Sequence, residues 1–552
     1  MRMLDSHELH QLREAQGTSD RLLEVVASLG MKSLEEAWRA ASYSLGLDFV
    51  DLTTTQPDLS LLKEFPLKVI HRYGVFPISR DSGSLIVVTG NPFDLQSVDA
   101  VGAVLGQAVL PVVAMPEEVS KLIKTHLGVG AETVDGLLAQ TDGVEVLEEL
   151  EFEGSEAAQE AQQASVVRLV NEILTEAVEA RSSDIHIEAQ AAGLRIRYRI
   201  DGVLQPQPMP PEINRFQAAI ISRLKIMAKL NIAEKRIPQD GRIKLKVSGR
   251  EVDIRVSIIP MLHGESVVMR VLDKNAMRFS LRGIGMDEEI YKQFNRIIRL
   301  PHGIILVTGP TGSGKTTTLY SCLSEIHDDE TKIITTEDPI EYQLEGINQI
   351  QVNHKVGLTF AASLRAILRH DPDVVLVGEI RDQETAENAI QASLTGHLVF
   401  STLHTNDAAG AYMRLVDMGI EPFLVSSTIE GVMAQRLVRT LCPECKEVYT
   451  PKRDEMPEDF PWDECHDLGD KLYRAVGCRT CRGSGYKGRM GLYEFLETND
   501  EIRHLTTNRV ASTQVKKMAM QAGMKTLRND GFSKIRRGIT TFDEVMRVTK
   551  AD

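Results

Sequence analysis

The spacing of hydrophobic positions changes several times along the chain, and each change indicates a different local structure. Within residues 1–50, apolar side chains recur at the spacing of amphipathic helices, which predicts short helices. Between residues 50 and 127, short apolar runs alternate with helical patterns, and Asn91-Pro92 interrupts them as a turn signal. We therefore expect a small α/β domain over residues 1–135.

A glutamate-rich segment follows this first domain. Residues 143–163 contain seven Glu and no Lys or Arg. Like charges repel one another and keep a chain extended and solvated. Residues 136–163 are therefore expected to form an acidic linker, in which some helix can occur.

A second α/β domain is expected over residues 164–275. A helical pattern begins at Ser165 and leads into strands in which polar and apolar residues alternate. In one of these strands Arg195, Arg197 and Arg199 alternate with apolar residues, so a period of two places the three arginines on one face. Further strands are expected at Arg242–Val247, Val252–Ser257 and Ser266–Leu272.

The clearest chemical motif lies in the remaining domain, residues 276–552. The sequence GPTGSGKT at residues 309–316 fits the pattern G-x-x-x-x-G-K-[ST], with a buried-strand pattern before it and a helical pattern after it. Its glycines let backbone N–H groups surround phosphate oxygens, and the helix N-terminus adds a positive dipole. Lys315 is expected to reach the β- and γ-phosphates of ATP, and the Thr316 hydroxyl to bind Mg²⁺. The predicted nucleotide-binding residues are Gly309, Pro310, Thr311, Gly312, Ser313, Gly314, Lys315, Thr316 and Thr317.

Polar residues also stand at the ends of three other apolar runs. Glu337 ends the first run, Glu379 follows the second and His404 follows the third. Because the carboxyl ends of parallel strands line one crevice of an α/β sheet, these side chains are expected near the bound nucleotide. Acids in that position can hold Mg²⁺ through water or orient the attacking water. Behind a phosphate-binding loop, they favour hydrolysis of the nucleotide over its storage.

Four of the six cysteines form two Cys-x-x-Cys pairs at about residues 440–490. Two such pairs can complete a closed tetrahedral shell around Zn²⁺, which predicts a structural zinc module; a redox dithiol is the alternative. The 32 residues between the pairs exceed the usual spacing, so an insertion is expected there. Cys465 and Cys322 are left over. The predicted zinc ligands are Cys442, Cys445, Cys478 and Cys481.

Several runs together resemble the secretion ATPase superfamily. EDPIE at 337–341, DPDVVLVGEIRD at 371–382 and LTGHLVFSTLHTND at 395–407 follow GPTGSGKT in the order of the family's Asp box, Walker B and His box. With KRIPQDGR at 235–242 and the cysteine module, the chain is most similar to the ATPases of type II secretion and type IV pilus assembly. The resemblance covers about Ser165 to Asp552 and implies a RecA-like P-loop ATPase domain preceded by a PAS-like α/β domain. The N-terminal domain matches only loosely, as a partner-docking domain.

The resemblance also implies roles for single residues. Glu337 would be the catalytic carboxylate and Glu379 the Walker B acid, at a place where Gly378 stands in the usual aspartate position. His397 and His404 would form a pair that senses the nucleotide state, although a histidine at a strand or helix end can be merely hydrogen-bonded. The implied nucleotide-contacting arginines of the second domain are Arg255 and Arg270, whose alternative role is that of solvated strand residues.

Composition narrows the class of protein further. The chain has 552 residues, of which 42% are hydrophobic and 26% charged, and its net charge is −15. These values are typical of globular domains, and the acidic balance argues against a nucleic-acid partner. The first ten residues lack a signal-peptide pattern and no apolar stretch reaches 18 residues, so a cytoplasmic protein is expected. The resemblance implies a homo-hexamer, peripheral to the inner membrane, with secretion-platform proteins docked on the N-terminal domain.

The function expected from these features is an ATPase motor that drives pseudopilus assembly for type II secretion across the outer membrane. A type IV pilus assembly motor has the same core chemistry and stays open as an alternative. A DNA-transport ATPase is more remote because the chain lacks a basic stripe. A scaffold that binds ATP without turnover is a further alternative, against which the acids at the strand ends argue.

Overall fold

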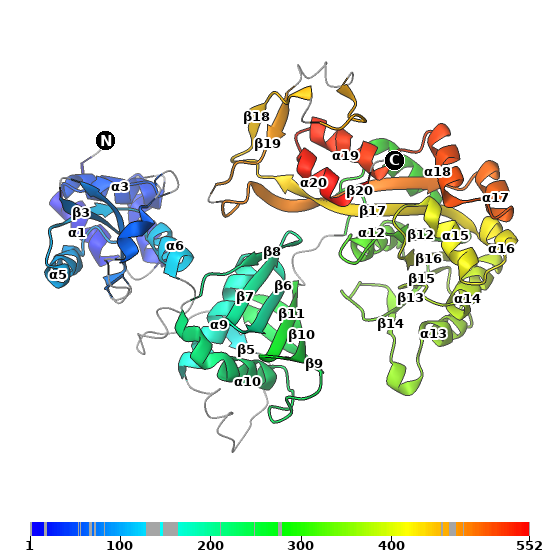
Figure 1. Cartoon of the computed structure of the whole chain (residues 1–552), viewed down its shortest axis with the longest axis horizontal. Coiled ribbons are helices and arrows are strands. Elements are labelled where there is room, and N and C mark those ends of the chain that lie inside the picture. Colours follow the sequence, from blue (N-terminus) through cyan, green and yellow to red (C-terminus); the bar gives the residue numbers. More distant parts are fainter. Residues whose placement is uncertain are drawn as a thin grey trace. The chain divides into compact units, whose positions relative to one another are not determined.

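The computed structural model describes most of residues 3–550. Two compact units, Met1–Asn275 and Ala276–Asp552, make up the chain (Figure 1). Most of the expected acidic linker and Cys465 lie outside the described residues, and the finer division of the first unit at residues 135 and 164 stays a prediction. The residues not described within this range are 16–18, 32, 53–54, 56, 64, 66–68, 71–72, 82, 128–143, 147–163, 210, 248, 274–278, 454–455, 463–470 and 479.

The first sheet of unit one has the strand order β1-β4-β3-β2. The β3–β2 pair is antiparallel and the other two pairs are parallel. Trp38, a buried residue of the third helix, donates its indole N–H to the Gly90 carbonyl at 2.9 Å. The strands are β1 Asp48–Phe49, β2 Val75–Asp81, β3 Ser84–Thr89 and β4 Val109–Val113; the helices are α1 Ser6–Glu14, α2 Ser19–Ser28, α3 Leu34–Ser44, η1 Leu59–Lys63, α5 Leu95–Leu105 and α6 Pro116–Leu127.

The second sheet of unit one is antiparallel throughout, in the order β5-β9-β10-β11-β6-β7-β8. Apolar residues of α9 and α10 pack on one face of it, and the other face carries the predicted arginines of β7. The elements are β5 Val144–Val146, α9 Ala164–Glu179, β6 Ser182–Gln190, β7 Gly193–Ile200, β8 Val203–Pro206, η2 Pro211–Phe216, α10 Gln217–Met227, β9 Gln239–Val247, β10 Arg250–Met261 and β11 Gly264–Asp273.

Part of the expected linker forms an edge strand. In β5, Val144 pairs with Val247 and Glu145 pairs with Lys246 of β9. The Val-Glu-Val alternation suits a half-buried strand, and opposite charges across a strand pair are favourable. The sequence prediction missed this strand because the high glutamate content of residues 143–163 outweighed a three-residue alternation.

Unit two is built on a seven-stranded sheet with the order β14-β13-β15-β16-β12-β17-β20. All neighbours are parallel except β17 and β20, which are antiparallel. The central strands are continuous apolar runs in which polar residues do not alternate, because both faces of the sheet are covered. The strands are β12 Gly303–Thr308, β13 Ile333–Glu337, β14 Asn348–Gln351, β15 Val374–Val377, β16 Leu398–Leu403, β17 Ile429–Leu441 and β20 Tyr486–Glu497.

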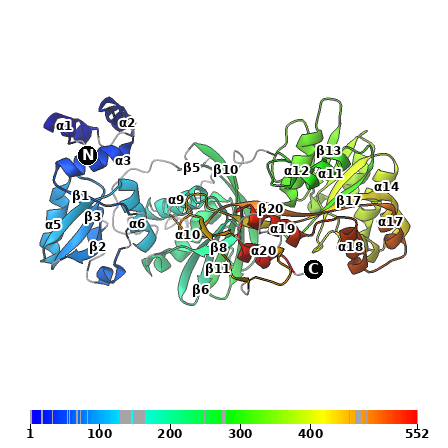
Figure 2. The same cartoon turned by 90° about the horizontal axis from the view of Figure 1, so that it is seen from above.

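Helices cover both faces of this sheet (Figure 2). Ile305 and Val307 of β12 point to the side of α11 and α12, whereas Ile304 and Leu306 point to the side of the other helices. Among the described residues, no helix has the length and apolar character needed to cross a bilayer. The helices are α11 Glu288–Ile297, α12 Lys315–Ile326, η3 His354–Val356, α13 Phe360–Ile367, α14 Gln383–Leu394, α15 Ala409–Asp417, α16 Pro422–Thr428, α17 Asp500–Thr507, α18 Ser512–Gln521, α19 Leu527–Arg536 and α20 Phe542–Val548.

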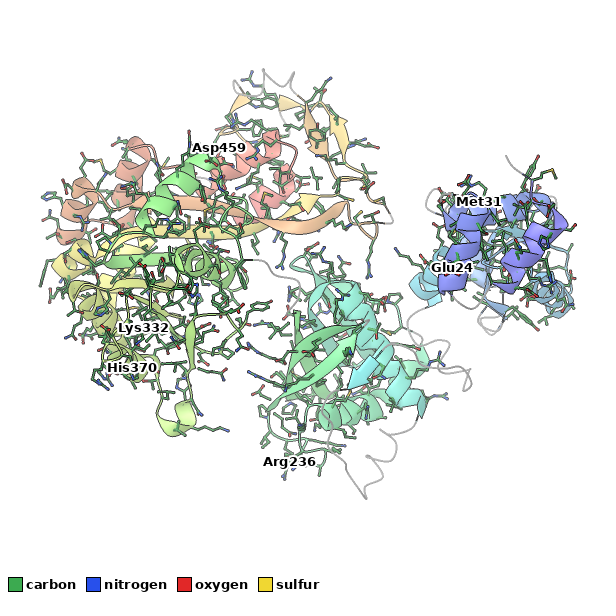
Figure 3. The ribbon with its side chains drawn as sticks, turned by 180° about the vertical axis from the view of Figure 1, so that it is seen from behind. Glu24, Met31, Arg236, Lys332, His370 and Asp459 are labelled. Atoms are coloured by element: carbon green, nitrogen blue, oxygen red, sulfur yellow. The ribbon has the colours of Figure 1, made fainter. Side chains whose placement is uncertain are left out.

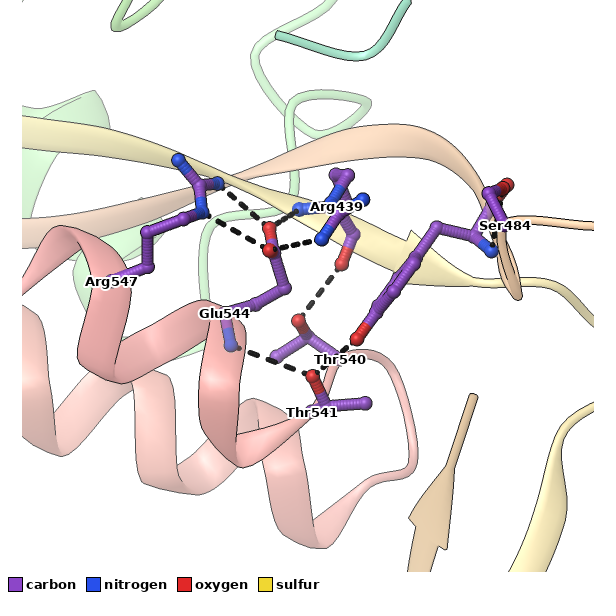
Figure 4. Close-up of polar contacts among 7 residues, drawn as sticks. Arg439, Ser484, Thr540, Thr541, Glu544 and Arg547 are labelled. Carbon is purple, nitrogen blue, oxygen red and sulfur yellow. Dashed lines mark hydrogen bonds and ion pairs between the residues drawn. The ribbon is translucent and has the colours of Figure 1, made fainter. Parts of the chain in front are cut away.

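A buried carboxylate ties α20 to β17 (Figure 4). Glu544 accepts hydrogen bonds from the Arg439 guanidinium at 2.7 Å, the Arg439 backbone N–H at 2.9 Å and the Arg547 guanidinium at 2.7 Å. Burial by itself would raise the pKa of Glu544, but the hydrogen bonds from Arg547 and Arg439 hold it at about 2. A second hydrogen bond between charged groups joins the Arg528 guanidinium of α19 to the carboxylate of Asp459, which Figure 3 labels.

The low pKa of Glu544 predicts a pH-dependent stability. Because this pKa is lower in the folded than in the unfolded protein, the contribution is fully present above pH 4.5 and is lost as the pH falls towards 2. The expected size is on the order of 3 kcal/mol in the free energy of unfolding. Urea denaturation of wild type and Glu544→Gln at pH 7 and pH 3 measures it. A stability difference between the two proteins that does not shrink at pH 3 would contradict the prediction.

Candidate nucleotide and metal sites

The predicted phosphate-binding loop connects β12 to α12. All six residues of β12 are buried, so the loop leaves the sheet from a fixed position. Gly312 and Gly314 have φ of +79° and +89°, a region that disfavours side chains. At Gly309 a Cβ would lie 2.6 Å from the Gln435 carbonyl oxygen, so β17 also demands glycine there.

Lys315, the first residue of α12, folds back over this loop. Its ammonium group donates to the Gly309 carbonyl at 2.8 Å and to the Pro310 carbonyl at 3.2 Å. Burial lowers the pKa of Lys315; the Glu379 carboxylate opposes this shift and the Arg436 charge adds to it. Carbonyl dipoles solvate the ammonium group here, and phosphate oxygens can replace them.

The loop is supported from the neighbouring strand by Gln435. Its buried amide donates to the Ser313 carbonyl at 2.6 Å and accepts from the Thr318 hydroxyl at 2.8 Å. One side chain of β17 therefore holds both the loop and the first turns of α12. Sequence reasoning missed Gln435, since only the pairing of β12 with β17 brings residues this far apart in the chain together.

Glu379 and His404 meet at the carboxyl edge of the sheet. The Glu379 carboxylate lies 3.3 Å from His404 Nε2 and 2.6 Å from a guanidinium nitrogen of Arg381. Thr308, at the end of β12, accepts from the Thr405 N–H at 2.8 Å and so joins the loop after His404 to the phosphate-binding strand. The structure thus brings Glu379 close to His404 and near enough to Lys315 for its charge to act on the ammonium group. This agrees with their expected positions at the ends of parallel strands.

Glu337 is held differently, inside the fold. Its carboxylate is buried and accepts hydrogen bonds from the hydroxyl of Tyr320, from the Thr335 hydroxyl at 2.5 Å and from the Gln349 amide at 3.1 Å. Burial, and then the Glu337 charge, raise the pKa of Tyr320, which therefore stays protonated and can donate. Because Tyr320 belongs to α12, this bond connects the helix of the phosphate-binding loop directly to Glu337.

The two histidines of the predicted pair do not come together. His404 follows β16, whereas His397 precedes it, so about 20 Å of strand separates them. His397 Nδ1 lies 2.9 Å from the Ala392 carbonyl oxygen at the end of α14. His397 is therefore hydrogen-bonded at a helix end and apart from His404, and its role in sensing the nucleotide stays a prediction.

Arg255 and Arg270 lie on unit one, directly opposite each other on β10 and β11. Arg242 of β9 is the next residue of the same cross-strand row. Arg270 also donates to Asp184 at 3.2 Å. Residues directly opposite each other on neighbouring strands share one face of the sheet, so the three arginines lie side by side; the nucleotide contact expected of Arg255 and Arg270 stays a prediction. Only the strand register shows Arg242 beside the two predicted arginines.

The four cysteines of the two pairs meet in one cluster. The Sγ atoms lie within 4.8 Å of one another, and the Cys442–Cys478 and Cys445–Cys481 separations are both 3.8 Å. A tetrahedral zinc shell with Zn–S bonds of about 2.3 Å has edges of about 3.8 Å. The residues therefore fit Zn²⁺, and a single four-thiol cluster favours this metal over two separate redox dithiols.

Backbone N–H groups around this cluster also favour metal binding. Burial would raise the pKa of Cys481, but N–H groups of Cys478 and Gly485, at 3.1 and 3.2 Å from its sulfur, hold it at about 7. The thiolate is the form that binds a metal. The cluster lies beside the two-stranded ribbon of β18 Glu447–Tyr449 and β19 Leu472–Arg474.

Comparison with known proteins decides the family. The family described as "Type II/IV secretion system protein" matches residues 159–547, and the MshEN domain matches residues 45–133. The chain belongs to the Type II/IV secretion system protein family. It is 44% identical over its whole length to type II secretion system protein E of Xanthomonas campestris, covering 97% of that protein. The identity is 54% to type II secretion system ATPase E of Vibrio cholerae, over 70% of this chain and 76% of that protein.

Relatives from pilus assembly and from solved structures extend this result. The type IV pilus assembly ATPase PilB of Myxococcus xanthus is 42% identical over 93% of this chain and 90% of its own length. The ATPase DotB of Yersinia pseudotuberculosis shares the fold with a TM-score of 0.51 at 20% identity, over 74% of this chain and 98% of that chain. The predicted α/β fold with a RecA-like ATPase domain is confirmed.

Proposed function

We propose that the chain is the ATP-hydrolysing motor of a type II secretion system and drives pseudopilus assembly. The observation that carries the proposal is the meeting of Lys315, Glu379 and His404 at one sheet edge, in a chain whose relatives are named type II secretion system protein E. Residues Gly309–Thr317 would bind ATP and Mg²⁺, with the phosphates on the loop N–H groups and Mg²⁺ at Thr316. The cysteine cluster would hold a structural Zn²⁺.

Assembly and location follow from the same proposal. We expect a homo-hexamer in the cytoplasm, peripheral to the inner membrane, whose N-terminal domain docks on secretion-platform proteins. The match of residues 45–133 to the MshEN domain, separate from the ATPase match, supports a dedicated docking domain. Arg255 and Arg270 would supply positive charge to a nucleotide when their domain approaches a phosphate-binding loop.

Replacing the catalytic carboxylate tests the chemistry. Glu337→Gln is expected to bind ATP but to lower kcat by about 10²-fold or more, because an amide cannot polarise water as a carboxylate does. The measurement is steady-state phosphate release together with ATP binding, with Lys315→Ala as the variant that lacks the phosphate contact. Normal turnover in Glu337→Gln together with loss of turnover in Glu379→Gln would move the catalytic assignment to Glu379.

Type IV pilus assembly is the second candidate, because the identity to PilB extends over 93% of the chain. A deletion strain complemented with wild type or Lys315→Ala separates the two functions. Secretion-motor activity predicts that exoproteins accumulate inside the deletion strain and that wild type, but not Lys315→Ala, restores their release. Loss of surface pili with unchanged exoprotein release would favour the pilus motor instead.

A further inference from the structure

Arg436 places a second positive charge at the phosphate-binding loop. It follows Gln435 on β17, beside the strand that carries the loop. A Cβ on Gly309 would lie 3.2 Å from Arg436 Nη1, so the guanidinium group is packed against the first glycine of the motif. This residue is not part of the GPTGSGKT motif, and the sequence pattern did not single it out.

The hydrogen bonds of Arg436 go to backbone carbonyls and not to a carboxylate. Nη1 donates to the Gln435 carbonyl at 2.9 Å, and Nη2 donates to the Asn406 carbonyl at 2.8 Å. Within the part of the chain that the structure describes, no carboxylate forms an ion pair with Arg436. The nearby Glu494 carboxylate instead accepts the backbone N–H groups of Ala408 and Leu527.

Two partly buried cations therefore stand together at the loop. Burial lowers the pKa of Arg436 and of Lys315, and the Arg436 charge lowers that of Lys315 further. Backbone carbonyl oxygens accept the hydrogen bonds of both groups. The carboxylates of Glu379, near Lys315, and of Glu494 and Asp407, near Arg436, offset part of this charge from a distance without a direct ion pair among the described residues. Bringing like charges together in a half-buried place is unfavourable unless an anion joins them.

We infer that Arg436 is a phosphate-binding residue, which together with Lys315 contacts the β- and γ-phosphates of the bound nucleoside triphosphate. The planar guanidinium fork suits phosphate oxygens, and two carbonyls already fix its orientation. The bond to Asn406 further links this contact to the loop that follows His404. The inference rests on the proposed function, since it requires a nucleotide in the loop.

Arg436→Gln separates the phosphate contact from a structural role. Glutamine keeps an N–H donor for the backbone carbonyls but removes the charge. Loss of a charge-assisted hydrogen bond is expected to weaken binding of ADP and of a non-hydrolysable ATP analogue roughly 10- to 100-fold. AMP, which lacks the β- and γ-phosphates, should bind wild type and Arg436→Gln with equal affinity. Arg436→Lys retains a positive charge but lacks the planar guanidinium group, so its affinity for ADP should lie between those of wild type and Arg436→Gln.

The matched control is Arg414→Gln, which removes one positive charge from the exposed face of α15. The full-length proteins are compared by fluorescence titration and by thermal unfolding without nucleotide. An Arg436→Gln protein that binds ADP as wild type does, or that loses AMP and ADP affinity equally, overturns the inference. Failure of wild type and Arg414→Gln to bind any nucleotide overturns the proposed function together with it.

Discussion

Replacement of Arg255 or Arg270 by alanine is expected to lower the ATPase rate of the assembled protein about 10³-fold or more. Arginine that reaches the transferred phosphoryl group stabilises the charge of the transition state and contributes roughly 10³–10⁵ in rate. Both residues belong to the unit that lacks the phosphate-binding loop. If a neighbouring subunit presents these arginines to the nucleotide, as we propose, wild-type specific activity should rise with protein concentration.

The strand register adds a second expectation for these variants. Arg242, Arg255 and Arg270 lie side by side across β9, β10 and β11, so removing one of them relieves repulsion. In Arg270→Ala this gain is offset by loss of the partly exposed ion pair with Asp184, and such pairs contribute little to stability. Thermal stability should therefore stay close to that of wild type while activity is lost.

The control for this experiment is Arg195→Ala, which removes an exposed arginine of β7 that lies opposite Glu188 in the strand register. It should retain wild-type activity at every concentration. Activity that does not depend on concentration, with Arg255→Ala and Arg270→Ala both near wild type, would make the two arginines ordinary solvated strand residues.

Removal of zinc is expected to unfold the cysteine module and leave the nucleotide site intact. Binding at a structural thiolate site is worth on the order of 10 kcal/mol, and this free energy is folding free energy of the module. Wild type should contain one zinc per chain by elemental analysis. Cys442→Ser and Cys478→Ser should lose the metal and become sensitive to proteolysis at residues 440–490, while ATP still binds at the loop more than a hundred residues away.

Cys322→Ala is the matched control, because Cys322 is a buried thiol of α12 outside the cluster. It should keep its zinc and its resistance to protease. Zinc-free protein after purification without chelators, or a Cys442→Ser variant with an intact module, would contradict the zinc assignment.

Much of the fold could be predicted because the hydrophobic pattern reports burial directly. The run Gly303–Val307 has no polar alternation, which indicates a strand covered on both faces, and β12 is such a strand. The alternation of Arg195, Arg197 and Arg199 with buried residues likewise identified a strand with one solvated face. The edge strand β5 escaped because pairing with β9, and not its own three-residue sequence, stabilises it.

The residues of the candidate sites could also be predicted only in part. GPTGSGKT, Glu379, His404 and the two Cys-x-x-Cys pairs could be recognised because each is a local pattern beside a strand or turn. Their neighbours could not be recognised, since the contacts join segments distant in the chain. Gln435 and Arg436 reach the loop only through the pairing of β17 with β12, and Tyr320 reaches Glu337 only because α12 packs across the sheet.

The sequence by itself determined which chemistry this protein can carry: a loop for phosphate, acids at strand ends and four thiols for a metal. Backbone N–H groups, carboxylates and thiolates have intrinsic affinities that follow from residue type and short spacing. The tertiary structure alone decided the environment of each group. It buried Glu337 beneath Tyr320, paired Glu379 with His404, separated His397 from them by the length of β16, and placed Arg436 beside Lys315. Strand order and register bring such groups together, because they depend on how all the buried surfaces pack at once and not on any one segment.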